Sequence, residues 1–178
     1  MSKTSLVITI LGQDRSGLVD SIAQTVAEHG GNWVESRMAH LAGQFAGILR
    51  VDVAAQEAQA LTAALGSLSA GGLESTVHLD ATEPAVSEKS AMQLSLVGQD
   101  RPGIVREISR VLANHGVNVE ELQTECTRAA NTGQSLFQAE AQLRLPEAVS
   151  AETLRTALEE VAADMMVDLS LVRASSKG

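Results

Sequence analysis

An aspartate occupies the same short motif at two places in the chain. The motif reads GQDRSG from Gly12 and GQDRPG from Gly98, so Asp14 and Asp100 each stand three residues before a second glycine. A carboxylate in such a turn could hold an ammonium group, and the free N–H groups of a following helix could hold a carboxylate. Together they would complement a zwitterion such as an amino acid. In a simpler interpretation the glycine only turns the chain and the aspartate caps the helix.

The remaining polar residues suggest neither catalysis nor metal binding. The motif is neither a Walker A loop nor a G-x-G-x-x-G fingerprint. His29 and His115 directly precede glycines at predicted helix ends, where an imidazole interacts with the last carbonyl groups. His40 and His78 have no partners at metal-ligand spacing, and Cys126 is predicted to be a passive thiol. We therefore predict no catalytic residue, no metal site and no cofactor, and do not expect an enzyme.

The two motifs belong to a longer repeat. With an offset of 86, about half of the positions in Gly12–Glu35 are identical in the second copy. The offset then grows to 92, which pairs Phe45 with Phe137 and Leu79 with Leu171. A repeat of this length predicts two domains rather than short solenoid units.

The domain boundaries follow from this repeat. We predict domain 1 at residues 1–81, a linker at 82–90 and domain 2 at 91–178, because the polar, proline-containing stretch between the copies is typical of a linker. The second copy carries about six extra residues, which we expect around 128–134.

Each copy shows the pattern β-α-β-β-α-β. In the first copy we expect a buried strand at 5–11, a helix from 18 to the Gly30-Gly31 pair, strands at 32–41 and 44–53, a helix at 56–68 and a strand at 73–79. In the second we expect a strand at 92–97, a helix at 102–115, strands at 118–127 and 135–145, a helix at 151–163 and a strand at 165–172. The predicted class is α+β: two tandem ferredoxin-like units with helices on one face of each antiparallel sheet.

The composition restricts the partners. The net charge is −9, from 13 basic and 22 acidic residues, and aromatic residues make up 2% of the chain, which argues against direct nucleic-acid binding. We find no apolar run of about 18 residues or more, so we expect no membrane span. A single cysteine excludes an intrachain disulfide and favours the cytoplasm.

These features resemble the ACT domain. The match consists of a strand, the sequence GQDRPGIV, a helix and the sequence NHGVNVEEL within a β-α-β-β-α-β unit, and both copies carry it. ACT domains are amino-acid-sensing modules attached to metabolic enzymes and regulators. Two in tandem without a catalytic domain are similar to regulators that repress transcription of the glycine cleavage system through a partner activator in response to glycine. The alternative is a free-standing regulatory subunit that docks on an enzyme of amino-acid metabolism.

The resemblance also implies a site. In ligand-binding ACT domains the ligand lies where the first loop meets the first helix, often between two domains. It implies an amino-acid ligand, with glycine first, a protein partner such as a transcription activator, and allows a homo-oligomer. The serine-sensing members carry a polar side chain where this chain has Gly12 and Gly98, which argues against serine. The implied ligand-binding residues are Asp14, Gly17, Leu18, Val19, Asn32, Asp100, Gly103, Ile104, Val105 and Asn118.

Overall fold

The computed structural model describes residues 2–80, 90–129 and 133–174. The chain divides into two compact units, Met1–Ala85 and Val86–Gly178, which we call domain 1 and domain 2. The linker predicted at 82–90 lies outside the described residues except for Ser90, so its limits stay a prediction.

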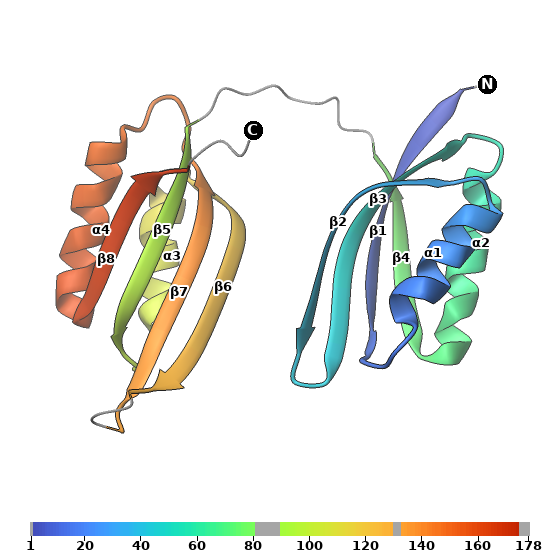
Figure 1. Cartoon of the computed structure of the whole chain (residues 1–178). Coiled ribbons are helices and arrows are strands. Elements are labelled where there is room, and N and C mark those ends of the chain that lie inside the picture. The colour runs from blue at the N-terminus through green and yellow to red at the C-terminus, as the bar shows by residue number, and fades with distance from the viewer. Residues whose placement is uncertain (1, 81–89, 130–132, 175–178) are drawn as a thin grey trace. The chain divides into compact units, whose positions relative to one another are not determined.

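Domain 1 contains a four-stranded antiparallel sheet with two helices on one face (Figure 1). The strand order is β2-β3-β1-β4, so the first strand is central and pairs with both the third and the last. Its elements are β1 (Lys3–Gln13), α1 (Leu18–Glu28), β2 (Asn32–Leu41), β3 (Gln44–Ala54), α2 (Ala58–Ser67), the short 3-10 helix η1 (Leu68–Gly71) and β4 (Leu73–Leu79).

Domain 2 repeats this arrangement, with strand order β6-β7-β5-β8. Figure 1 shows α3 and α4 on the same face of its sheet. The predicted fold class is therefore confirmed in both copies. The elements of domain 2 are β5 (Ala91–Gln99), α3 (Ile104–Asn114), β6 (Asn118–Arg128), β7 (Ser135–Arg144), α4 (Ala151–Met165) and β8 (Val167–Arg173).

The hydrophobic pattern explains the two layers. In α1, Leu18, Ile22 and Val26 recur every four residues and form the buried stripe of the helix. In β1 alternate residues are buried, whereas Leu11 is 50% exposed. The predicted strand is therefore buried on the face that the helices cover, and the side chains of its other face are partly or largely exposed within the domain.

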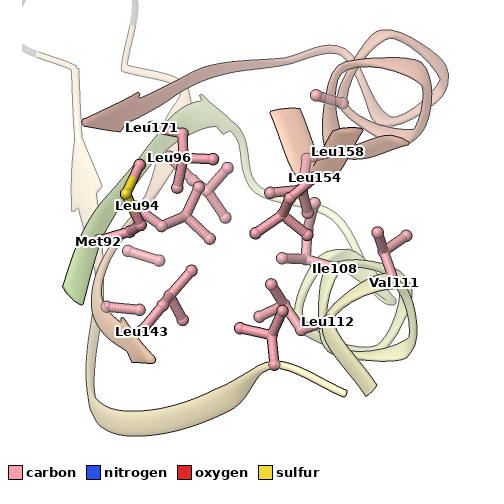
Figure 2. Close-up of a cluster of buried hydrophobic side chains, with 14 of the residues drawn as sticks. Met92, Leu94, Leu96, Ile108, Val111, Leu112, Leu143, Leu154, Leu158 and Leu171 are labelled. Atoms are coloured by element: carbon pink, nitrogen blue, oxygen red, sulfur yellow. The ribbon is translucent and has the colours of Figure 1, made fainter. Parts of the chain in front are cut away.

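The core of domain 2 fills the space between its helices and its sheet. Figure 2 shows Leu94 and Leu96 of β5 facing Ile108 and Leu112 of α3 and Leu154 of α4. Among the described residues of both domains, no polar or charged side chain is buried. Both cores are therefore held by apolar packing alone.

Both helices of domain 2 have one end that differs from its predicted position. Helix α3 begins at Ile104, because Pro102 belongs to the turn and Gly103 caps the helix. Met165, predicted as strand, is the last residue of α4, and Met166 ends this helix with φ 55 and a side chain that is 64% exposed. The sequence carries no warning of this, since a left-handed helix end usually contains glycine.

The last strands align differently from the predicted offset. In β1, Leu6 pairs with Leu79, whereas its equivalent Met92 in β5 pairs with Arg173. Leu79 therefore corresponds to Arg173 and not to Leu171. The reason is that the stretch leading into the last strand is two residues longer in domain 2, where the copies share too little sequence to reveal it.

The extra residues of the second copy lie where we expected them. Ala42 and Gly43, both with positive φ, form the two-residue connection between β2 and β3. Residues 129–134 connect β6 and β7, of which 130–132 lie outside the described part of the chain.

Candidate functional site

The turn between β1 and α1 leaves the start of the helix open. Gly17 caps α1 with φ 88, which a glycine adopts without the strain other residues would suffer. No side chain accepts a hydrogen bond at this cap, and nothing lies within 4 Å of the position where a Cβ of Gly17 would be. The first-turn N–H groups therefore remain available to an anion.

Asp14 does not cap this helix. Its backbone N–H donates to the carbonyl of Gly43 at 2.9 Å, which ties the turn to the tip of the β2–β3 hairpin. Its carboxylate lies 3.6 Å from Nδ1 of His40, for which the sequence spacing alone indicates no partner. Nε2 of His40 accepts from the N–H of Gly43 at 3.2 Å, so the neutral ring carries its proton on Nδ1, toward Asp14. The carboxylate is 36% exposed and within reach of a ligand.

Domain 2 repeats the open helix start. Gly103 caps α3 with φ 98, again without a side-chain hydrogen bond, and the N–H of Asp100 donates to the carbonyl of Ser135 at 2.9 Å. By contrast, Ser150 caps α4, since its hydroxyl oxygen accepts from the N–H of Thr153 at 3.0 Å. Helix α2 also lacks a side-chain cap, so the open start alone does not single out the two turns. What the two turns share, and α2 does not, is a glycine cap with positive φ that follows an aspartate by three residues, since Glu57 caps α2 with φ −92.

Cys126 occupies in domain 2 the position that His40 occupies in domain 1. His40 pairs with Phe45 across the hairpin, and Cys126 pairs with the equivalent Phe137. Although the thiol is exposed, partial desolvation raises its pKa, and the charge of Asp100 and a hydrogen bond to it raise the pKa further. Each turn thus places its aspartate beside a second side chain from the neighbouring hairpin, which is a histidine in one copy and a cysteine in the other.

This contact predicts how Cys126 reacts. Because a raised pKa leaves less thiolate, we expect the thiol to react with a chromogenic disulfide reagent at pH 8 more slowly than a free cysteine does. Asp100→Asn removes the negative charge and should increase the rate a few-fold, whereas Asp168→Asn, on β8, should not change it. The same rate in both variants and the wild type would show that Asp100 does not act on the thiol.

The arginines of the turns do not pair with carboxylates. Arg15 donates through Nη2 to the carbonyl of Gly71 at 3.0 Å, and Nη2 of Arg101 lies 4.0 Å from Sδ of Met166. Neither guanidinium forms an ion pair within the described ranges. Arg15 therefore fastens its turn to the end of η1 and remains exposed.

Gly12 and Gly98 serve packing rather than ligand contact. A Cβ on Gly12 would lie 2.6 Å from the carbonyl oxygen of Gly72, and one on Gly98 would lie 2.5 Å from Cγ1 of Val167. In each domain the residues at the start of the last strand, which pairs with the first, lie too close to leave room for a side chain. This explains why no polar side chain stands at these positions.

The predicted hydrophobic site residues divide into two kinds. The side chains of Leu18 and Ile104 lie in the two cores, so only their backbone N–H groups face the turns. Val19 and Val105 are 48% and 45% exposed beside the turns. Together with Asp14, Gly17, Asp100 and Gly103, these residues form one cluster in each domain.

Asn32 and Asn118 lie apart from these clusters. Asn32 begins β2 and pairs with Asp52, whereas His40, near the end of the same strand, lies beside Asp14. Eight residues of extended strand span about 26 Å, so the asparagine stands at the other end of the sheet. Asn118 occupies the same place in β6. The structure does not bring either residue to the turn of its own domain.

His29 and His115 lie at the helix ends where we predicted them. Nδ1 of His29 hydrogen-bonds the carbonyl of Thr25 at 2.9 Å, and Nδ1 of His115 hydrogen-bonds that of Val111 at 2.8 Å, so each ring donates to the last turn of its helix. Within residues 2–80, 90–129 and 133–174, no three His, Cys, Asp or Glu side chains are grouped to hold a metal ion. None of the described helices is long and apolar enough to cross a membrane.

Comparison with known proteins identifies the family. Two models of the ACT domain match residues 4–78 and 92–161, which together make up most of the chain. The UPF0237 protein MK1213 of Methanopyrus kandleri is 36% identical over 77 residues, which are 43% of this chain and 79% of that protein.

Two solved structures resemble the whole chain. A protein of unknown function from Galdieria sulphuraria is 29% identical with a TM-score of 0.88, covering 98% of this chain and 100% of the other. A candidate glycine cleavage system transcriptional repressor is 16% identical with a TM-score of 0.70, covering 99% and 100%. The latter likeness shows the fold alone. The chain therefore belongs to the ACT-domain family of regulatory modules and carries two such domains in tandem.

Proposed function

We propose that this protein is a cytoplasmic amino-acid sensor that binds its ligand at the turn between the first strand and the first helix of a domain. The observation that carries the proposal is the repeated combination of an uncapped helix start with an adjacent, exposed aspartate. The N–H groups of α1 or α3 would donate to the ligand carboxylate, and Asp14 or Asp100 would accept from its ammonium group.

Glycine is the first ligand that we propose. The turn of domain 1 offers groups for the two charged ends of an amino acid, and a ligand without a side chain needs no further contacts. The full-length likeness in fold to a candidate repressor of the glycine cleavage system supports the same ligand. At a ceiling of about 1.5 kcal/mol for each of five heavy atoms, glycine would bind no tighter than a few micromolar, as suits a metabolite sensor.

The output that we propose is control of glycine cleavage transcription through a partner activator protein. The net charge of −9 supports an indirect effect, because DNA affinity comes largely from neutralised phosphates. Glycine would favour one of two states that differ in affinity for the activator, since a ligand shifts an equilibrium only by its differential binding. Sequence-specific DNA binding by the purified protein alone would contradict this part.

The proposal is tested by measuring the thermal unfolding midpoint of the purified chain with each of the twenty amino acids at about 10 mM. A ligand present at about 100 times its Kd adds about 2.7 kcal/mol, a shift of several degrees for domains of this size. We expect glycine to give such a shift and Asp14→Ala or Asp100→Ala to abolish it, which identifies the working domain. Asp164→Ala, an exposed position on α4, is the control. No shift with any amino acid, or a full shift in both variants, would contradict a turn site.

A further inference from the structure

Helices α1 and α2 cover one face of the domain 1 sheet (Figure 1), and the opposite face is apolar at its centre. On that face Leu11 of β1 and Ile48 of β3 are 50% and 47% exposed, and Ala39 and Ala46 are also exposed. These four side chains are neighbours, because Ala46 pairs with both Leu11 and Ala39, and Ile48 is the next residue of β3 on the same face. We call them the apolar patch.

The equivalent face of domain 2 is polar. Strand register equates Ile48, which pairs with Thr9, and Glu140, which pairs with Ser95. The positions equivalent to the apolar patch carry Val97, Glu125, Gln138 and Glu140. Domain 2 therefore shows that this face of the fold can be made of side chains suited to water. The apolar patch of domain 1 is better explained by a protein surface that covers it.

Two charged side chains flank the apolar patch at opposite edges of the sheet. Arg37 of β2 pairs with Ile48, and Glu74 of β4 pairs with Leu11. Both are exposed, and neither forms an ion pair with any other residue that the structure describes. Opposite charges at the two edges of one face match a second copy of the same face, since each copy can then offer its guanidinium to the carboxylate of the other.

We propose that two copies of the chain dimerise by packing these faces of domain 1 against each other. The two-fold axis lies between the sheets and runs parallel to the strands, so equivalent strands point in the same direction and the sheets lie about 10 Å apart. Because the strand order is β2-β3-β1-β4, β2 then lies over β4 of the second copy, and β3 lies over its β1.

This arrangement places large side chains over small ones. Ile48 lies over Thr9 of the second copy, and Leu11 lies over Ala46 of the second copy, because each of these pairs shares a row of the sheet. Four strands about 4.8 Å apart, most of them ten or eleven residues long, present about 600 Å² per copy. That area is at the lower end for a specific interface, so we expect a dimer that dissociates on dilution.

The same arrangement pairs the two edge charges. Glu74 of the second copy lies over Ala39, whose small side chain leaves room for the carboxylate to reach Arg37, the preceding residue of β2 on this face. The contact occurs twice, once at each edge. An axis perpendicular to the strands would instead place β2 over β2 and β4 over β4, which brings like charges together at both edges.

Sedimentation velocity of the full chain between about 1 and 200 μM tests the dimer, which we expect to form as the concentration rises. Ile48→Glu introduces the residue that domain 2 carries at the equivalent position, so the variant should fold. It should weaken dimerisation by about tenfold or more, because it buries an unpaired carboxylate in the interface. The matched control is Val97→Glu on the same face of domain 2, which should leave dimerisation unchanged.

A charge exchange tests the pairing at the edges. Arg37→Glu and Glu74→Arg each bring like charges together and should weaken dimerisation several-fold, whereas the double variant restores opposite charges and should recover most of the loss. Both positions are exposed, and the emission of Trp33, which packs against the core of domain 1, shows whether each variant is folded.

Three results would overturn the proposal. The first is a wild-type chain that stays monomeric up to about 200 μM. The second is a dimer that folded Ile48→Glu and Arg37→Glu variants form as readily as the wild type, since the second copy would then bind elsewhere. The third is a double charge variant that dimerises no better than the single variants. None of these results depends on an amino-acid ligand, so the proposed function is tested separately.

Discussion

Replacing Leu49 with alanine is expected to lower the free energy of unfolding of domain 1 by about 3–5 kcal/mol. Leu49 is 1% exposed at the centre of β3 and pairs with Ile8, which is fully buried. Its loss removes apolar contacts and leaves a cavity that the surrounding strands and α1 cannot close. The change reproduces in domain 1 the residue that domain 2 carries at position 141, so it also tests whether the two cores are equivalent.

Urea unfolding followed by tryptophan fluorescence measures this loss in one domain. Trp33 is the single tryptophan of the chain and packs against the core of domain 1, so its emission reports on that domain. Ala141→Leu is the matched control and should leave the Trp33 transition where it is. A loss below about 1 kcal/mol would show that domain 1 tolerates the deletion, and that Leu49 does not fill the space we assign to it.

Gly12→Ala is expected to destabilise domain 1 by about 1–3 kcal/mol. The added Cβ would lie 2.6 Å from the carbonyl oxygen of Gly72 and 3.1 Å from Cδ1 of Leu73. A backbone oxygen cannot rotate away as a long side chain would, so the backbone must shift where Leu73, at the start of β4, pairs with Gly12. The loss is measured by the same Trp33 transition.

Gly66→Ala provides the opposite control in the same domain. Gly66 lies within α2, and nothing is within 4 Å of the position of its Cβ. Alanine has the higher helix propensity, so this variant should be more stable by about 0.5–1 kcal/mol. If Gly12→Ala were as stable as the wild type, the close approach of Gly72 and Leu73 would not require a glycine at position 12. A role for this residue in ligand contact would then become the better explanation.

The fold could be predicted because the same pattern occurs in both copies of the repeat. Hydrophobic spacing placed the helices and strands in each copy, and the shared GQDR motif aligned them. The errors in element ends and in alignment occur where the local sequence carries no signal. Met166 ends α4 in a left-handed conformation although it is not a glycine. Two residues added before the last strand of domain 2 make Arg173, and not Leu171, the equivalent of Leu79.

The site was predictable only in its local part. Asp14 and Gly17 lie in one turn, whereas His40 reaches Asp14 through the pairing of β2 with β3. One sequence signal for this contact did exist. The offset of 86 between the repeats aligns His40 with Cys126, so both copies carry a polar side chain at this position. Asn32 was grouped with the turn by resemblance, but the length of β2 carries it to the other end of the sheet. Its role as a ligand contact stays a prediction.

The strand order of each domain has a consequence for synthesis on the ribosome. The first strand is central, and its pairing with β4 joins residues as distant as Leu6 and Leu79. Domain 1 can complete its sheet only after Leu79 has left the exit tunnel, so β1 waits with one side unpaired while most of the domain is translated. Such long-range pairing slows folding. Since domain 2 supplies no strand to this sheet, domain 1 can finish folding while the second copy is still being made.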